Sequence, residues 1–207
     1  DTTYADGANS LAQYRVKWAE SLLDENYLDL MAETSVVATW DDHEVENNWD
    51  PEKENQTKVT AARDAFFEHL PTGSPNGEQV IWRSLRWGKT VEVFVLDTRS
   101  ERKPSTIFSQ SPIYISEAQM SWLKTSLTDS DAMFKIIVNS VPITDMPALF
   151  LTTWDRWQGY AAQRQELLSH ILGDVDGTVV FLSGDFHFPA TTHVGKPGSA
   201  DNVLREI

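Results

Sequence analysis

Four short runs of apolar and β-branched residues predict the strands of this chain. They are SVVATW (35–40), VEVFVLD (91–97), FKIIVNS (134–140) and TVVFLSGD (178–185). Three of these runs are nearly continuous, which is typical of strands buried on both faces of a sheet. The run at 91–97 mixes apolar with polar residues, so we expect it to lie nearer an edge of the sheet.

Between these runs the apolar positions follow a helical period. The pattern predicts helices at 9–32, 57–70, from Ser116 to Leu127, and 161–172. Ser116 and Gln119 are spaced as a capping box for the third helix, and Gly173 is expected to close the last one. The remaining stretches are predicted loops, at 71–78, 102–113 and 144–160. Strands that alternate with helices indicate a layered α/β fold.

Composition and charge narrow the class of protein. A chain of 207 residues with 41% hydrophobic content suits a single globular domain over 1–207. The formal charge of −14 argues against a broad basic face for nucleic acid or anionic membrane. The absence of cysteine excludes a thiolate metal site, and no run is apolar for long enough to predict a transmembrane segment. DTTYADG at the start and NVLREI at the end look internal, so we expect a fragment.

Polar side chains collect where the predicted strands end. The first strand leads into Asp41, Asp42 and His43, the second into Asp97 and Arg99, the third into Asn139, and the fourth into Asp185 and His187. In layered α/β folds, ligands bind beyond the carboxyl ends of strands. Asp, His and Asn favour hard or borderline metal ions, whereas arginine suits a phosphate or carboxylate. The pattern therefore predicts metal-assisted phosphoryl chemistry.

Other catalytic classes lack their motifs. The chain has no G-x-S-x-G elbow, WGKT (87–90) lacks the first glycine of a P-loop, and HEVEN is not the zinc motif H-E-x-x-H. Several polar residues have a structural interpretation instead. Asp97 is expected to orient Arg99 or to cap a turn, and Asn139 is expected to cap the end of its strand. Trp154 and Trp157 are expected first to pack in the core or in a loop, with stacking on a substrate as a second role. No chemistry is expected of the remaining histidines, which are His69, His170 and His193.

Four segments carry a resemblance to a known family. In order, WDDHEVENNW, LDTRSER, WDRWQGYAAQRQELL and LSGDFHF resemble the PhoD-like alkaline phosphatases, which belong to the calcineurin-like metallophosphoesterases. The resemblance covers nearly the whole chain. It implies a four-layer α/β/β/α sandwich with two mixed sheets, incomplete here at both ends. It also implies hydrolysis of phosphate monoesters and diesters by a metal-activated hydroxide that attacks phosphorus in line.

The resemblance also assigns roles to residues of this chain. It implies two or more divalent or trivalent ions (Fe, Ca, Mn, Zn or Mg, which the sequence does not distinguish) and these ligands: Asp1, Tyr4, Asp42, Asn47, Asp185 and His187. Asn48 is the alternative to Asn47, and Asp1 would bridge two ions. His43 would hold a phosphate oxygen or protonate the leaving group, and Arg99 would add positive charge in the transition state. The substrate side would comprise Arg99, Asp155, Arg156 and Tyr160, with Arg164 in the same segment.

The sequence departs from the family pattern at three places, and more than one function remains open. The strand expected before Asp1 is absent, Gln158 stands where the family usually has Asp, and Glu46 replaces another Asp. Asp41 and Glu44 are expected to support the ligands. The alternatives are a phosphodiesterase or phospholipase-type activity on the same fold, or a metal-binding module without catalysis. The expected partner is a small phosphate ester. The resemblance favours a secreted or periplasmic protein, and the sequence leaves the compartment and the oligomeric state open.

Overall fold

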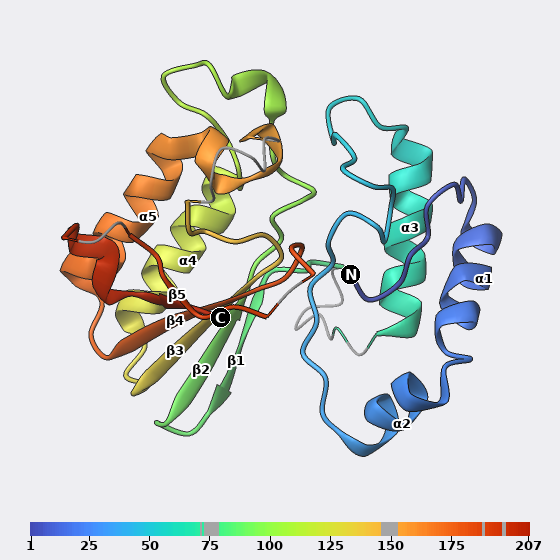
Figure 1. Cartoon of the computed structure of the whole chain (residues 1–207), viewed down its shortest axis with the longest axis horizontal. Helices are drawn as coiled ribbons and strands as arrows, with labels where there is room; N and C mark the ends of the chain where they lie inside the picture. Colours follow the sequence, from blue (N-terminus) through green and yellow to red (C-terminus); the bar gives the residue numbers. More distant parts are fainter. Residues whose placement is uncertain (71, 73–78, 146–152, 188, 196–197) are drawn as a thin grey trace. The chain divides into compact units, whose positions relative to one another are not determined.

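A computed structural model of the chain describes residues 1–70, 72, 79–145, 153–187, 189–195 and 198–207 (Figure 1). These residues form two compact units, called here unit 1 (Asp1–Ile81) and unit 2 (Trp82–Ile207). The prediction of one domain over 1–207 stays a prediction. In the part of the chain that is described, no helix has both the length and the apolar character needed to cross a membrane.

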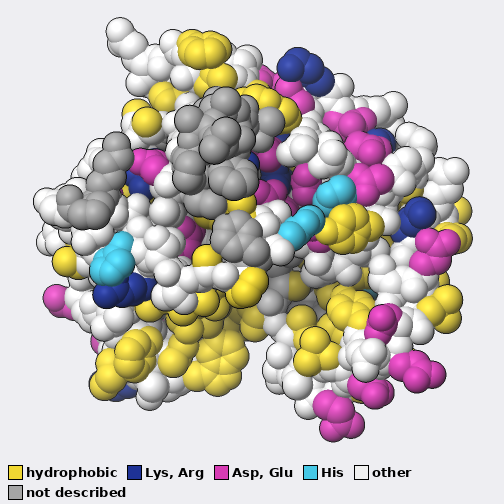
Figure 2. All heavy atoms as spheres, viewed as in Figure 1, with side chains coloured by type: hydrophobic (Ala, Val, Ile, Leu, Met, Phe, Trp, Pro, Cys, Tyr) yellow, Lys and Arg dark blue, Asp and Glu magenta, His cyan; other side chains and the backbone are white. Residues whose placement is uncertain are grey.

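Unit 1 is helical, with α1 (Leu11–Ser21), α2 (Glu25–Glu33) and α3 (Gln56–His69). The single helix predicted over 9–32 is two helices. The reason is Asp24, whose side chain accepts hydrogen bonds from the backbone N–H groups of Asn26 and Tyr27 and so begins a second helix. The helix predicted at 57–70 is confirmed as α3. Helix α2 buries none of its residues, and acidic side chains gather over it in Figure 2.

Aromatic side chains form the core of unit 1. Trp18 of α1 meets Phe66 of α3 edge to face, and Trp40 packs against both Phe66 and Trp49. The strand predicted at 35–40 is wrong, because this extended segment is not part of a strand in the described structure. Its apolar residues Ala38 and Trp40 are instead buried in the helical core.

Unit 2 is built on a six-stranded mixed sheet in the order β1-β2-β3-β4-β6-β5. The strands are β1 (Arg83–Trp87), β2 (Val91–Val95), β3 (Phe134–Asn139), β4 (Thr178–Ser183), β5 (Thr192–His193) and β6 (Arg205–Glu206). Strands β2, β3, β4 and β6 run parallel, and β1 and β5 pair antiparallel at the two ends. Three of the four predicted strands are thus confirmed as β2, β3 and β4.

Helices cover one face of this sheet. Helices α4 (Glu117–Asp129) and α5 (Ala161–Asp174) lie side by side on it in Figure 1. Their apolar side chains join those of the sheet in one buried core, which includes Phe94, Ile137, Phe181, Leu123, Leu127, Leu167, Leu168 and Ile171. Short 3-10 turns complete the unit at Pro104–Thr106, Thr153–Asp155, Trp157–Tyr160 and Ala200–Val203.

The predicted α/β class is confirmed, with corrections of detail. The described strands lie in one mixed sheet, whereas two sheets were predicted. Strand β2 was expected near an edge but lies between β1 and β3. Its polar residue Glu92 is accommodated because its carboxylate accepts a hydrogen bond from the buried Ser130 hydroxyl (2.6 Å).

Two helix ends test the capping predictions. Ser116 caps α4 as predicted, since its hydroxyl accepts from Gln119 N at 3.1 Å. The Gln119 side chain does not return to Ser116 but bonds to Asp97 and Glu101. Gly173 lies inside the last turn of α5, so it does not close the helix. Most of the predicted loop at 71–78, and residues 146–152 of the loop at 144–160, lie outside the described residues.

Candidate functional site

In unit 1 the residues after 40 fold into a tight turn around Asp42. The Asp42 carbonyl accepts from Val45 N and Glu46 N at 2.8 and 2.9 Å. Its carboxylate accepts from His43 N at 3.0 Å and from Asn48 N at 2.6 Å. Asn48 adopts the left-handed conformation (φ 50°), which asparagine tolerates better than most residues. The Asp42 carboxylate is therefore buried and held in one orientation.

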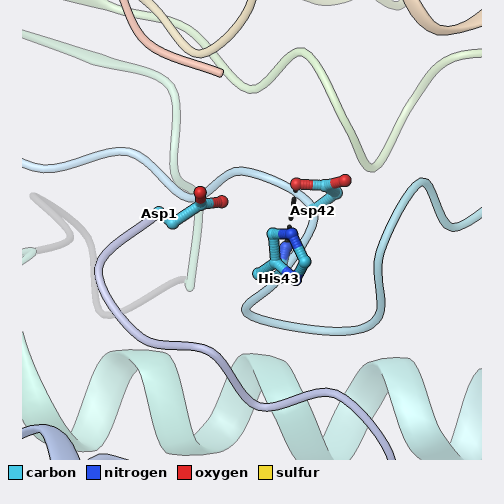
Figure 3. Close-up of side chains that lie close together, drawn as sticks. All are labelled: Asp1, Asp42 and His43. Carbon is cyan, nitrogen blue, oxygen red and sulfur yellow. Dashed lines mark hydrogen bonds between the residues drawn. The ribbon is translucent and has the colours of Figure 1, made fainter. Parts of the chain in front are cut away.

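Asp1, Asp42 and His43 form a cluster that could hold a cation. Figure 3 shows the three side chains close together, Asp1 from the N-terminal segment and the other two from the turn. Each of them offers a ligand atom, and all of these atoms lie within 4.8 Å of one another. The fold thus brings Asp1 to Asp42 and His43, which lie far from it in the sequence. Ligation by Asn47, another predicted ligand, stays a prediction.

Glu44 joins the N-terminal segment to the turn. Its side chain is fully buried. One carboxylate oxygen accepts from the Thr2 hydroxyl at 2.6 Å and from the backbone N–H groups of Thr2 and Thr3, and the other accepts from Asp41 N at 2.8 Å. This carboxylate fixes residues 2–3 against the turn, and Asp1 with them. The expected supporting role of Glu44 thus has a physical basis.

His43 is held by two neighbours. Its Nδ1 lies 2.6 Å from an Asp6 carboxylate oxygen, and its ring lies 4.3 Å from the Tyr4 ring between centroids. Tyr4 is half exposed, at 52%. Partial burial, and then the negative charges of Asp42, Glu44, Asp41 and Asp6, raise the pKa of the Tyr4 hydroxyl. Tyr4 thus lies beside the cluster, as expected of a further ligand, and its ligation stays a prediction.

Unit 2 gathers polar side chains where the parallel strands β2, β3 and β4 end. Beyond β2, the Asp97 carboxylate accepts from Arg99 N at 3.1 Å and from Ser100 N at 2.9 Å, which sets the direction of Arg99. At the end of β3, the Asn139 amide donates to the Val141 carbonyl and accepts from Trp157 Nε1. Both structural interpretations made from the sequence, for Asp97 and for Asn139, are confirmed.

A buried ion-pair chain links the segment after β2 to the segment after β4. Arg99 Nη1 donates to Asp155 at 2.6 Å, and Arg99 Nη2 donates to Asp185 at 3.0 Å. Arg102 donates to the same Asp155 oxygen at 2.5 Å. Arg99 is fully buried, with its guanidinium between two carboxylates, so in this structure it positions Asp185. The predicted contact of Arg99 with phosphate stays a prediction.

The GDFH segment after β4 has an unusual backbone. Asp185 and His187 both adopt positive φ, 68° and 54°, which costs free energy for residues other than glycine and recurs at functional sites. The intervening Phe186 turns its ring to Arg156, whose guanidinium carbon lies 4.4 Å from the ring centroid. Arg156 is 8% exposed, and its Nε and Nη1 have no hydrogen-bond partner within the described residues.

Two residues predicted to contact the substrate are buried, and their contact with a substrate stays a prediction. Asp155 is 1% exposed and is occupied by Arg99 and Arg102. Tyr160 is fully buried, and its hydroxyl donates to the Trp154 carbonyl at 2.7 Å. Both therefore support the site from within. Arg164, expected beside them, is occupied by the carbonyls of Ile143 and Val194.

Sequence reasoning missed two residues near these side chains. One is Asp6, the partner of His43, and the other is Arg102, which shares Asp155 with Arg99. Each has a weak signal in the sequence: Asp6 follows Tyr4 within DTTYAD, and Arg102 is the second arginine of LDTRSER.

An acidic cluster with a histidine, and a second Asp–His pair beyond a parallel strand, are typical of metal-dependent hydrolases. Comparison with known proteins gives the family. The family model "PhoD-like phosphatase" matches residues 1–207, so the chain belongs to that family. This confirms the resemblance inferred from the four motifs.

Two relatives support this assignment. "Alkaline phosphatase D" of Bacillus subtilis (strain 168) is 31% identical over 205 residues, which cover 86% of this chain and 35% of that protein. A solved structure described as "Structure of PhoD" matches with a TM-score of 0.80 and 26% identity, over 96% of this chain and 44% of the solved chain. The chain thus spans about a third of the curated relative.

Proposed function

We propose that this chain is part of an enzyme that hydrolyses phosphate esters with the help of bound metal ions. The observation that carries the proposal is the Asp1–Asp42–His43 cluster, in a chain that belongs to the PhoD-like phosphatase family. The Bacillus subtilis relative is named alkaline phosphatase D, and the present chain spans 35% of that protein. The activity is therefore proposed for the protein that contains this chain.

The residues fit hard or borderline cations. The cluster offers carboxylate oxygens and an imidazole nitrogen, which are ligands of Ca, Mg, Mn, Fe and Zn. The Asp42 carboxylate accepts from His43 N at one oxygen and from Asn48 N at the other, which fixes its orientation. Asp185, His187, Tyr4 and Asn47 are proposed as further ligands. A bound cation supplies Lewis acidity toward a phosphoryl oxygen and makes water more acidic.

The remaining site residues act on the substrate or on the ligands. Arg156 binds a phosphoryl oxygen, because its guanidinium carbon lies 4.4 Å from the Phe186 ring centroid and its Nε and Nη1 have no partner in the described chain. His43 contacts the phosphate or its leaving group. Arg99 fixes the Asp185 carboxylate, and Asp155 fixes Arg99.

The test compares ligand variants of both units for hydrolysis of p-nitrophenyl phosphate and for bound metal. Asp42→Asn, Asp185→Asn and His187→Ala are expected to lose hydrolysis and to bind less metal by elemental analysis, since each removes a ligand. Glu166→Gln is the matched control: within the described residues its carboxylate forms an exposed ion pair with Lys124 at 2.9 Å and touches none of the predicted ligands. Full activity in Asp185→Asn and His187→Ala would refute the proposal.

Two further measurements separate the alternatives. Turnover of a phosphodiester such as bis-p-nitrophenyl phosphate, measured beside the monoester, distinguishes a diesterase from a monoesterase. Stoichiometric metal without turnover of either ester would identify a metal-binding module. The expectation of a secreted or periplasmic protein rests on the resemblance, and fractionation of expressing cells would test it.

A further inference from the structure

The segment between β2 and α4 carries an exposed aromatic side chain that the proposed site does not use. Phe108 is 95% exposed, more than any other large hydrophobic side chain among the described residues. Its neighbour Ile107 packs against the core of unit 2, and Pro104 is buried. In the view of Figure 1 this light-green segment projects beyond the ends of α4 and α5. Residues 105–111, which have Phe108 at their centre, are called here the tip.

Hydrogen bonds close the loop that carries the tip. Lys103 and Ile113 form an antiparallel bridge, in which Lys103 N donates to the Ile113 carbonyl at 2.7 Å. The Thr106 hydroxyl accepts from Ile113 N at 2.9 Å and donates to the Lys103 carbonyl at 2.6 Å. Ser109 N donates to the Thr106 carbonyl at 2.8 Å. The backbone on both sides of Phe108 is thus fixed, and its side chain is held outward.

The loop has no acidic residue, although the protein is strongly acidic. The chain contains 31 Asp and Glu residues, and none of them lies between Glu101 and Glu117. The exposed residues of the tip other than Phe108 are uncharged, namely Ser105, Ser109, Gln110 and Ser111. Their hydroxyl and amide groups donate and accept hydrogen bonds. The tip therefore combines one large apolar side chain with neutral polar groups.

The size and charge of the tip indicate which kind of surface it fits. A stable protein interface takes about 20–30 residues from each partner, whereas the tip exposes five. A phospholipid surface needs no matching pocket, because an apolar side chain enters between the head groups and binding follows the apolar area that it buries. The net charge of −14 disfavours an anionic lipid surface. A zwitterionic surface has no such repulsion.

We propose that the tip binds a zwitterionic phospholipid surface by inserting Phe108 among the head groups, whose phosphate and ester oxygens accept hydrogen bonds from the neighbouring serines. The contact is also tied to the polar side chains of unit 2. Arg102, at the base of the loop, donates to the same Asp155 oxygen as Arg99, and Arg99 donates to Asp185. Binding at the tip thus fixes Asp185 relative to the lipid surface. The binding itself does not depend on the proposed function.

Phe108→Ser is the decisive variant, because it removes the apolar group from a position where almost none of it packs against the protein. Phe108→Leu keeps most of the apolar area and is the conservative variant. Leu23→Ser is the matched control. Leu23 is 81% exposed in unit 1 and is followed by Asp24 and Glu25, so this variant removes a comparably exposed apolar side chain from acidic surroundings.

The experiment is flotation of the full chain with phosphatidylcholine vesicles over a range of lipid concentrations, without substrate. Binding should weaken about tenfold in Phe108→Ser, and stay within about threefold of the wild type in Phe108→Leu and within about twofold in Leu23→Ser. Vesicles with equal parts of anionic phosphatidylglycerol should bind the wild type more weakly. Hydrolysis of p-nitrophenyl phosphate without lipid should be the same in Phe108→Ser and the wild type.

Several outcomes would overturn the inference. They are a wild type that does not float with phosphatidylcholine, equal binding of wild type and Phe108→Ser, and a loss in Leu23→Ser as large as in Phe108→Ser. Tighter binding to the anionic vesicles would overturn the zwitterionic preference. Slower hydrolysis of the soluble ester in Phe108→Ser would place Phe108 on the substrate side instead. Binding that depends on Phe108, in a protein that hydrolyses no phosphate ester, would support this inference and refute the proposed function.

Discussion

The predicted site residues of the two units are held in place by different interactions. In unit 1, Asp42 and Glu44 accept hydrogen bonds mainly from backbone N–H groups of two loop segments, 1–8 and 41–48. In unit 2, Asp155 and Asp185 are held by the side chain of Arg99, which is fully buried.

The difference has an energetic consequence. A carboxylate that accepts from backbone N–H groups is stabilised by neutral dipoles, so its removal leaves unpaired donors. A carboxylate that is paired with a buried arginine becomes an uncompensated buried charge when the arginine is removed, which costs more. Substitutions that disturb the fixing groups are therefore expected to have larger effects on stability in unit 2 than in unit 1.

The largest expected effect is that of Arg99→Leu. It removes the partner that Asp155 and Asp185 share, while Asp155 keeps its ion pair with Arg102, so the free energy of unfolding should fall by about 3 kcal/mol in urea denaturation, the lower end of the cost of breaking a buried ion pair. Lys124→Leu in the same unit removes the exposed ion pair with Glu166 and should cost about 0–1 kcal/mol. Equal losses in the two variants would show that the buried ion pairs of Arg99 stabilise the protein no more than an exposed ion pair does.

Glu44→Gln tests the corresponding group of unit 1. The substitution keeps the volume but faces the Thr2, Thr3 and Asp41 N–H groups with an amide that offers one acceptor oxygen. We expect a loss of about 1.5–3 kcal/mol by the same denaturation experiment. Glu33→Gln, exposed on α2, is the control and should leave the stability unchanged. A loss as large as that of Arg99→Leu would remove the contrast between the units.

Tyr14→Phe measures a single neutral contact in unit 1. The buried hydroxyl donates to the Val45 carbonyl at 2.9 Å, and its loss should cost about 0.5–1.5 kcal/mol below pH 10. Burial, and then the charges of Glu46, Glu54 and Asp6, raise the pKa of Tyr14 above its ordinary value of 10.0.

The sign of the pH dependence follows from that shift. Above pH 10 the unfolded chain releases the tyrosine proton first, so this part of the stability decreases as pH rises toward the folded-state pKa of Tyr14. The difference in stability between wild type and Tyr14→Phe should therefore shrink above pH 10 in thermal denaturation. A constant difference would contradict the raised pKa.

The smallest expected effect on stability is that of Arg156→Met in unit 2. The methionine keeps apolar contact with Phe186 and loses the cation–π interaction, about 0.5–1 kcal/mol. If Arg156 binds the phosphoryl group, KM for p-nitrophenyl phosphate should rise about tenfold, which corresponds to ~1.4 kcal/mol of binding. Lys103→Met, an exposed cation of the same unit, should leave KM unchanged. An unchanged KM in Arg156→Met would exclude the phosphate contact.

Much of the framework could be predicted from the sequence. The apolar runs at 91–97, 134–140 and 178–185 gave β2, β3 and β4, because strands in a parallel sheet are buried on both faces and read as continuous apolar segments. The run at 35–40 has the same composition but belongs to a helical core. An apolar run in the sequence indicates that its side chains are buried. It does not indicate whether a strand of a sheet or a group of helices buries them.

The sequence by itself determined the α/β class and the family, because periodicity and ordered motifs are properties of the chain alone. It also indicated Asp1 and Asp42 as ligands and His43 as a substrate-facing residue, and the fold brings ligand atoms of these three residues within 4.8 Å of one another. Only the tertiary structure decided that Arg99 and Asp155 are buried partners, that Arg156 has N–H groups without a partner in the described chain, and that Asp6 holds His43. Hydrogen bonds and ion pairs depend on the distance between atoms from separate segments, and that distance exists only once the chain has folded.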